Sequence, residues 1–429
     1  MQFQESPYLL ENIATGNRFS DTGWLLSDPS YPHPSLIRTI YQKRQLQLKE
    51  EHYGLYQFAD WLPLKRYLKR SAAPVTYRSN LLAQRLGLTN LYITFNGYWP
   101  QKGAFMETCS FKETEAYAVC GRMEKEGKKT LVVASAGNTA RAFARVCSDN
   151  EIPLLLCVPY VNLDALWFGA PIHECVRLLS TPPDSDYFDA IRLSNTVGSL
   201  ADFFEEGGAR NVARRDGMGT TVLSAATHIG ALPDYYVQAV GSGTGAIAAW
   251  EANLRLLEDG RFGKTTMKLI TIQNHPFTPM YEAWKMGSRS LLPYDDDTAR
   301  HHVHEIDAKV LSNRRPPYAI PGGLFDALSE TNGTMCSVTN REIAQAAALF
   351  EQTEGIDIHP AAAAALAGLQ QEIAKGAIDK RKIVMLNITG GGEKLFKEKH
   401  QLYYLQPRHI ISADTSAEEL CNMQINGII

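Results

Sequence analysis

The sequence predicts an α/β protein built on open, mostly parallel β-sheets, and three observations lead to that prediction. Short apolar runs recur along the chain, and amphipathic stretches with helical spacing separate them. This pattern is typical of parallel strands whose two faces are both covered by helices. At 429 residues the chain also has room for two or three domains, or for one large α/β unit with a lobe of its own.

The predicted strands follow one another from the middle of the chain towards its C-terminal part. They cover residues 130–135, 152–159, 235–240, 268–272 and 382–388. Gly137-Asn138 turns the chain out of the first strand into a helix over 139–146. Pro360 opens an alanine-rich helix over 361–369, because proline suits a first helical turn and alanine has the highest helix propensity.

The N-terminal region differs from the rest of the chain. Aromatic residues mix with polar ones over the first 75 positions, and Ser35 to Glu50 is basic with helix-like spacing. We interpret residues 1–75 as an N-terminal appendage and expect a helix over 35–50.

Composition excludes several function classes. Forty-three basic and 46 acidic side chains give a net charge of −3, so the chain lacks the basic footprint of a nucleic-acid or membrane-surface protein. Seven scattered cysteines, an odd number without a Cys-x-x-Cys pair, argue against a disulfide framework. The N-terminus lacks the features of a signal peptide, and no apolar run is long enough to span a bilayer. We therefore expect a cytoplasmic protein with small-molecule partners.

One lysine stands at an unusual place. Ser110-Phe111-Lys112 opens an amphipathic helix, and a cation at the positive end of a helix is disfavoured unless it is neutral or held as an imine. A surface lysine near a helix start is the alternative.

Two turns and one loop follow predicted strands. Ala134 to Ala140 exposes backbone N–H groups that suit a carboxylate, although an ordinary helix cap would look the same. Gly241 to Gly245 can cradle a phosphate, or can be purely structural, and it is neither a Walker loop nor a Rossmann fingerprint. Thr389-Gly390-Gly391-Gly392 ends the last strand. Open α/β sheets bind ligands at the carboxyl ends of their strands, where all of these segments are expected to lie.

A lysine for a Schiff base, donors for a phosphate and a neutral partner for a ring nitrogen are what pyridoxal 5′-phosphate requires. In these motifs the chain resembles the fold-type II pyridoxal-phosphate-dependent enzymes, in their threonine synthase and cysteate synthase branch. The family order is Ser110-Phe111-Lys112, Ser135-Ala136-Gly137-Asn138-Thr139, Gly241-Ser242-Gly243-Thr244-Gly245, Glu354-Gly355-Ile356 with Pro360, and Thr389-Gly390-Gly391-Gly392. The match extends to residues 90–100 and 206–219.

The resemblance implies a role for each motif. Lys112 would form the internal aldimine, Asn138 would bond the phenolic oxygen of the cofactor, and Thr389 would face its pyridine nitrogen. The phosphate would be held by Gly241, Ser242, Gly243, Thr244 and Gly245. The substrate carboxylate would be bound by Ser135, Ala136, Gly137 and Thr139.

The resemblance also implies an architecture. Two open, mostly parallel twisted sheets would carry helices on both faces, as in the tryptophan synthase β subunit. Residues 76–117 and 220–410 would form the large cofactor-binding domain, 118–219 a small mobile domain, and 411–429 a C-terminal tail. We expect a homo-oligomer.

The implied reaction is β-replacement, in which O-phospho-L-serine and sulfite give L-cysteate and phosphate through an aminoacrylate. Both the leaving phosphate and sulfite are dianionic near neutral pH, so cationic groups must face them. The candidates are Arg210, Arg214, Arg215 and Lys102, with Arg314 and Arg315 as weaker ones.

Other readings stay open. The chain could be a threonine synthase acting on O-phosphohomoserine, a β-replacement enzyme with another nucleophile, or an inactive relative that only binds the cofactor. A dinucleotide oxidoreductase would leave Lys112 and Thr389 without roles. Glu113 replaces the family's aspartate and is expected to point along the helix. His301, His302 and His304 are expected in a solvated loop, with no metal site.

Overall fold

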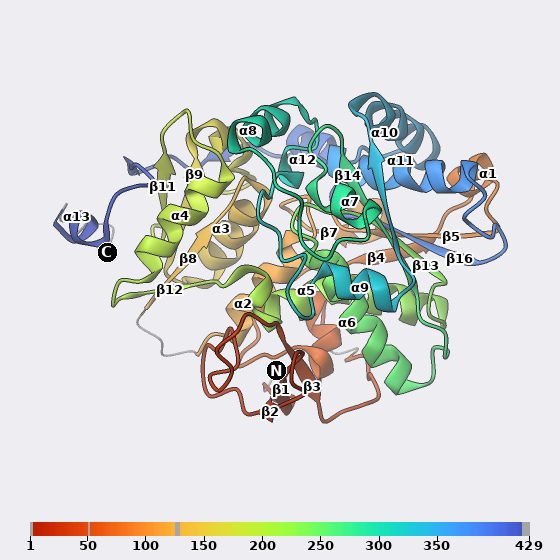
Figure 1. Cartoon of the computed structure of the whole chain (residues 1–429), viewed down its shortest axis with the longest axis horizontal. Coiled ribbons are helices and arrows are strands. Elements are labelled where there is room, and N and C mark those ends of the chain that lie inside the picture. Colours follow the sequence, from red (N-terminus) through yellow and green to blue (C-terminus); the bar gives the residue numbers. More distant parts are fainter. Residues whose placement is uncertain (1–2, 50–51, 125–128, 423–429) are drawn as a thin grey trace.

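A computed structural model of the chain describes residues 3–49, 52–124 and 129–422. It shows two mostly parallel sheets side by side, with a small antiparallel sheet of the N-terminal region below them in Figure 1. The predicted α/β class is confirmed. The five strands predicted from the apolar runs and the two predicted helices are all present.

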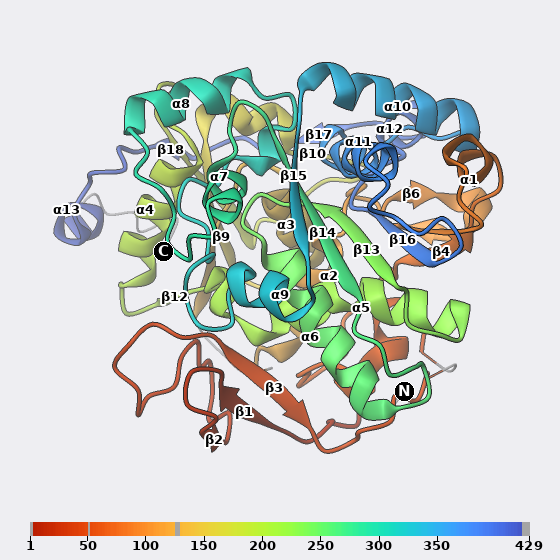
Figure 2. The same ribbon diagram turned by 45° about the vertical axis from the view of Figure 1, so that its right-hand side comes forward.

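The larger sheet has its strands in the order β15-β14-β13-β16-β5-β4, and only β4 runs antiparallel to its neighbour. These strands are β15 (Thr334–Val338), β14 (Lys268–Asn274), β13 (Tyr235–Ala239), β16 (Ile383–Ile388), β5 (Asn90–Phe95) and β4 (Val75–Arg78). Tyr236 faces a core shared with α5 (Val212–Ile229), α6 (Thr244–Asp259) and α9 (Leu324–Glu330). Its neighbour Val237 belongs to a separate core with α10 (Asn340–Glu354) and α11 (Pro360–Ala374). Figure 2 shows these two helices on the other side of the sheet from α6 and α9. Helices therefore cover both faces.

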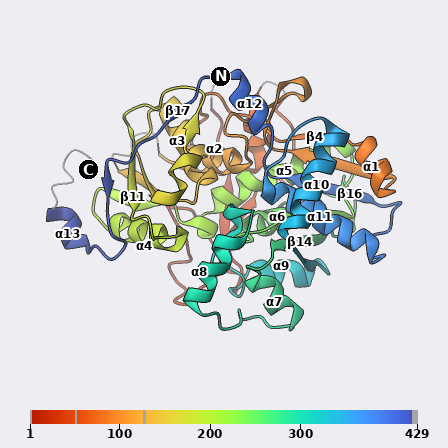
Figure 3. The same ribbon diagram turned by 90° about the horizontal axis from the view of Figure 1, so that it is seen from above.

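The smaller sheet has the order β12-β8-β9-β11-β18 and is parallel throughout. Its strands are β12 (Phe203–Glu205), β8 (Thr130–Ala134), β9 (Leu154–Pro159), β11 (Val176–Thr181) and β18 (His409–Ile410). Helix α3 (Asn138–Asn150) packs on one face and α4 (Tyr187–Gly198) on the other. The C-terminal segment returns to this sheet, and α13 (Ala417–Asn422) lies beside α4 (Figure 3).

The two sheets share one apolar core. Leu131 and Leu156 of the smaller sheet belong to the same buried cluster as Tyr236 and Leu269 of the larger one. The first helix after the lysine motif, α2 (Lys112–Arg122), contributes to this cluster and packs against α3 and α5. The carboxyl ends of β8 and β13 are thereby brought towards each other across the start of α2.

The N-terminal region contains the antiparallel sheet β2 (Arg18–Phe19), β1 (Tyr8–Asn12) and β3 (Ile37–Tyr41). The prediction of a helix over 35–50 is wrong, because β3 occupies the first part of this segment. Glu50 lies outside the described residues. Alternate residues of β3 are buried, and the Thr39 and Tyr41 hydroxyls each donate to Asp216 of α5 at 2.7 Å. Pairing with β1 and burial of its β-branched and aromatic side chains favour a strand here over the helix that the spacing predicts.

Helix α8 (Asp296–Glu305) carries His301, His302 and His304, which were expected in a loop. Asp295 caps this helix, because its side chain accepts a bond of 2.9 Å from the Thr298 backbone N–H. The remaining described helices are α1 (Leu81–Leu86), α7 (Pro279–Lys285), α12 (Glu393–Lys399), and the 3₁₀ segments η1 (Gly54–Trp61), η2 (Pro100–Lys102), η3 (Tyr160–Ala165), η4 (Gly208–Arg210) and η5 (Lys309–Leu311). Two-residue strands pair as β6 (Tyr98–Trp99) with β7 (Ala104–Phe105), and β10 (Trp167–Phe168) with β17 (Tyr403–Tyr404).

Of the helices described, none is long and apolar enough to cross a membrane.

Candidate active site

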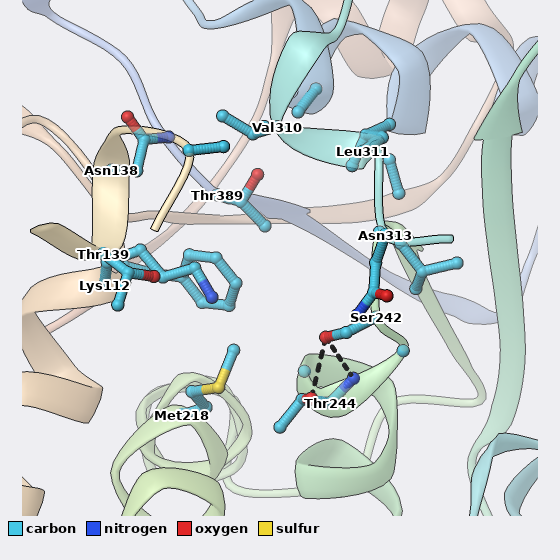
Figure 4. A pocket seen from close by; sticks show the side chains of 18 of the residues that line it. Lys112, Asn138, Thr139, Met218, Ser242, Thr244, Val310, Leu311, Asn313 and Thr389 are labelled. Carbon is cyan, nitrogen blue, oxygen red and sulfur yellow. Dashed lines mark hydrogen bonds between the residues drawn. The ribbon is translucent and has the colours of Figure 1, made fainter. Parts of the chain in front are cut away.

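A cavity lies where the strand ends of both sheets meet the beginning of α2 (Figure 4). Its wall contains Lys112, the turn after β8, the glycine turn after β13, and Thr389 after β16. Segments separated by more than a hundred residues therefore converge as the sequence analysis expected for a ligand site. The predicted residues that line it are Lys112, Ser135, Ala136, Gly137, Asn138, Thr139, Arg214, Gly241, Ser242, Gly243, Thr244, Gly245 and Thr389.

Lys112 is the first residue of α2, and hydrogen bonds tie its segment to the loop after β16. The Phe111 backbone N–H donates to the Thr389 carbonyl at 3.0 Å, and that of Gly391 donates to the Cys109 carbonyl at 3.1 Å. The lysine and Thr389 are thus fixed relative to each other by backbone bonds alone. This arrangement depends little on side-chain rotamers.

The Lys112 amine lies in a buried, charged environment. Burial lowers the pKa of Lys112, and Glu115, whose Oε2 is 3.0 Å from Nζ, partly opposes that shift. A lowered pKa increases the neutral fraction of the amine, and only the neutral amine is a nucleophile. Lys112 is therefore suited to covalent attachment of an aldehyde.

The turn after β8 is held by its own side chains. The Ser135 hydroxyl oxygen accepts bonds of 2.9 Å from the backbone N–H groups of Gly137 and Ala140. Asn138 begins α3, and its Oδ1 accepts a bond of 3.0 Å from Arg141. Because the oxygen end of the carboxamide is engaged in this way, its nitrogen end is the part that can donate to a ligand.

Arg141 positions this turn, and sequence reasoning did not find it. Its guanidinium is buried, donates to the Thr108 carbonyl at 2.9 and 3.1 Å, and lies 4.1 Å from the centre of the Trp167 ring. It therefore connects the Asn138 turn to the segment that carries Lys112. No local spacing signals such a contact between distant segments.

The glycine turn after β13 forms an anion cradle at the N-terminus of α6. The Ser242 and Thr244 hydroxyls are 2.8 Å apart, and the Thr244 backbone N–H donates to Ser242 at 3.3 Å (dashed in Figure 4). A Cβ on Gly241 would lie 2.8 Å from the Val310 carbonyl, and Gly243 has φ of 81°. The N-terminus of a 16-residue helix and its hydroxyls suit a phosphate group.

Of the three arginines of segment 210–215, only Arg214 lines the cavity. It is buried between Glu206, 2.8 Å from Nε, and Glu115, 3.3 Å from Nη1. Burial would lower the pKa of Arg214, but these two carboxylates raise it above its ordinary value. The cation is therefore permanently charged.

The other predicted cations lie elsewhere. Arg210 pairs with Glu205 at 2.7 Å and is about half exposed. Arg215 is buried, donates to Glu251 at 2.9 Å, and contacts the carbonyls of Ala209 and Ile37. Lys102 lies 4.7 Å from the centre of the Tyr77 ring, and Arg314 pairs with Asp186 and Asp296.

Glu113 does not extend along the helix surface. It is buried and accepts bonds from the Thr108 backbone N–H at 2.6 Å and from the Thr108 hydroxyl at 2.9 Å. Burial raises the pKa of Glu113 to about 8. Glu113 thus closes the turn that precedes Lys112. Sequence reasoning also missed Glu115, although its spacing of three residues from Lys112 on a helix is a usable signal.

A partly buried lysine, a glycine turn at a helix N-terminus and a neutral hydroxyl at Thr389, grouped at the strand ends of two mostly parallel sheets, fit pyridoxal phosphate and define a fold-type II enzyme of that class. Residues 94–390 match the family described as "Pyridoxal-phosphate dependent enzyme". Cysteate synthase of Methanosarcina acetivorans is 47% identical over 415 residues, which are 96% of this chain and 99% of that protein. Cysteate synthase of Methanocella paludicola is 48% identical over 366 residues, 85% of each chain. The chain therefore belongs to the pyridoxal-phosphate-dependent enzymes and, among them, to the cysteate synthase family.

Solved structures share the fold at low identity. Maize serine racemase has a TM-score of 0.56 at 12% identity and covers 76% of this chain and 91% of its own. Threonine deaminase isoform 2 of Solanum lycopersicum has a TM-score of 0.51 at 18% identity, covering 76% and 88%. The cofactor prediction is confirmed by the family match: the enzyme uses pyridoxal 5′-phosphate.

Proposed function

We propose that the enzyme converts O-phospho-L-serine and sulfite to L-cysteate and phosphate. The observation that carries this proposal is the 47% identity to a cysteate synthase over nearly the full length of both chains. In the reaction the bond from Cβ to the phosphate oxygen breaks and its electron pair leaves with phosphate. A lone pair on the sulfite sulfur forms the new bond to Cβ, so no oxidant or reductant is needed.

Lys112 is proposed as the residue that holds the cofactor and carries the Cα proton. When bound, the cofactor withdraws electrons from Cα, so that this proton can leave. The Lys112 amine, whose pKa is lowered by desolvation, would take the proton and later return it. Lys112 is the only group proposed to do both, because the residue that would hold the cofactor would also lie beside the substrate carbon that the cofactor activates.

The remaining contacts are proposed from the cavity wall. The turn 241–245 holds the cofactor phosphate, Asn138 donates to the phenolic oxygen, and Thr389 faces the pyridine nitrogen as a neutral partner. The turn 135–139 binds the substrate carboxylate. Its backbone N–H groups at the start of α3 support this assignment.

Arg214 is proposed to stabilise the phosphate that leaves Cβ. Its place in the cavity wall and its burial support this role, because a charge-assisted bond is stronger where water is excluded. Glu115 and Glu206 hold its guanidinium from two sides. Arg210 and Arg215, which lie outside the wall, are not included.

The domain division is also a proposal. Residues 118–219 would move as a small domain against 76–117 and 220–410, with 1–75 as the appendage and 411–429 as the tail. Closure would exclude water from the reacting centre. We further propose a homo-oligomer that works in the cytoplasm.

The test supplies the holoenzyme with O-phospho-L-serine or O-phosphohomoserine, with and without sulfite, and measures phosphate and amino-acid products. We expect phosphate from phosphoserine and sulfite-dependent cysteate, both abolished in Lys112→Ala. Threonine formed from phosphohomoserine would instead identify a threonine synthase. Phosphate without cysteate would indicate another nucleophile, and a yellow protein without turnover would indicate an inactive relative.

A further inference from the structure

A second cavity adjoins the active site on its outer side. It shares Tyr187, Arg214, Ser242, Thr244 and Asn313 with the inner cavity, so the two cavities are adjacent. From there it extends between α4 of the smaller sheet and the loop 313–320 of the larger one. A small molecule bound in this outer cavity would therefore lie next to the active site, at the seam between the two sheets.

Three arginines line this outer cavity, and two of them are held in ion pairs. Arg210 pairs with Glu205, and Arg214 pairs with Glu206 and Glu115. Arg315 has no ion pair to a carboxylate within the described part of the chain. Its guanidinium instead lies over the Phe188 ring, 4.9 Å from the ring centre. It is thus the arginine of this cavity that no carboxylate of the described residues holds.

The loop holds Arg315 in place. Its backbone N–H donates to Asn313 Oδ1 at 2.9 Å, and the two prolines that follow restrict its backbone to extended conformations. The preceding Arg314 is anchored to Asp186 at 3.0 Å and to Asp296 at 2.8 Å. The free guanidinium is therefore presented by a rigid segment, which reduces the entropy lost when it binds a ligand.

We propose that the outer cavity is the subsite of the oxyanion nucleophile and that Arg315 recognises it. This rests on the proposed function. The first substrate would fill the inner cavity, bound to the cofactor and to the turn 135–139, which leaves the adjoining outer cavity for the nucleophile. A planar guanidinium matches the oxygens of sulfite in a two-pronged contact, whereas a hydroxyl or thiol nucleophile would not need it.

The test compares Arg315→Gln with Arg341→Gln, an exposed arginine of α10 that lines neither cavity. For Arg315→Gln we expect the KM for sulfite to rise about tenfold to a hundredfold, the effect of losing one charge-assisted contact. The KM for phosphoserine and the rate of phosphate release without sulfite should stay within about twofold. Arg315→Lys keeps the positive charge but loses the paired N–H donors of the guanidinium. Its KM for sulfite should therefore lie between those of the wild type and Arg315→Gln. Equal melting temperatures of the variants exclude a folding defect.

An unchanged KM for sulfite, or an equal rise in the KM for phosphoserine, would overturn the proposal. A second experiment tests the subsite separately from the proposed function. Binding of sulfite to the borohydride-reduced holoenzyme is measured by calorimetry, because reduction blocks reaction at the cofactor. If sulfite binds the reduced wild type, and about tenfold more weakly the reduced Arg315→Gln variant, the subsite stands even where no cysteate is made. If sulfite does not bind the reduced wild type, the subsite is refuted even where cysteate forms.

Discussion

Replacing Glu115 with glutamine should lower the pH at which the apoenzyme takes up its cofactor. Glu115 is fully buried, and its two oxygens lie 3.0 Å from Lys112 Nζ and 3.3 Å from Arg214 Nη1. Its charge favours the ammonium form of Lys112, while Arg214 disfavours it. The substitution removes the effect of Glu115 and leaves that of Arg214 unopposed, so the pKa of Lys112 should fall.

The size of the shift follows from the geometry. Two charges 3.0 Å apart interact by about 5 kcal/mol at an effective dielectric constant of about 20, which is an upper limit for this pair. Opposite charges at such distances typically shift a pKa by about 1 to 3 units. We therefore expect the midpoint for cofactor attachment to fall by about 1 to 3 units, because only the neutral amine reacts.

The assay mixes apoenzyme with pyridoxal phosphate at a series of pH values and follows the appearance of yellow colour. Glu372→Gln is the matched control. Glu372 is buried and pairs at 2.8 Å with Lys375, also three residues away, but outside the cavity. The pH midpoint for cofactor attachment in Glu372→Gln should equal that of the wild type. A midpoint in Glu115→Gln that stays in place, or rises, would refute the assigned electrostatics of Lys112.

Three further predictions concern the same region. Lys112→Ala should give a colourless protein that takes no label from borohydride, as mass spectrometry of its peptides would show; label retained elsewhere would contradict the assignment. The pKa of Glu113 is raised from an ordinary 4.5 to about 8 in the folded state, so the folded protein keeps a proton that the unfolded chain has lost. The free energy of unfolding should therefore fall as the pH rises from about 4.5 to about 8, by about 4 to 5 kcal/mol in all. In Glu113→Gln that decline should disappear from the melting temperature measured against pH, and an unchanged slope would show that the carboxyl is ionised. Gly241→Ala would put a Cβ 2.8 Å from the Val310 carbonyl, so we expect the dissociation constant of the cofactor to rise at least about tenfold in an equilibrium titration, and wild-type affinity would count against the cradle.

The strands and the glycine turns could be predicted because they depend on local patterns. A run such as 382–388 is apolar at nearly every position, which is typical of a strand buried on both faces, and β16 occupies it. Backbone groups after such strands bind ligands whatever the details of packing, so the turns 135–139 and 241–245 could be selected as well. The helix expected over 35–50 failed because alternate burial in β3 depends on the sheet that it joins.

The arginines show what the sequence could not supply. Arg214 and Arg215 are adjacent on α5, so their side chains leave the helix about 100° apart and only one can face a given neighbour. Which one faces the cavity is set by how α5 packs against α2 and α6. The same holds for Arg141 and Glu206, whose partners lie far away in the chain or on another element.

The sequence by itself determined the chemical class of this protein: the α/β pattern, the lysine at a helix start and the glycine turns, because each is written in residues close together along the chain. Only the tertiary structure decided which charges meet around Lys112 and which arginine is left unpaired in the outer cavity. Those contacts join segments that lie about a hundred residues apart or more, and their energies depend on distance and burial, which exist only once the sheets have packed together.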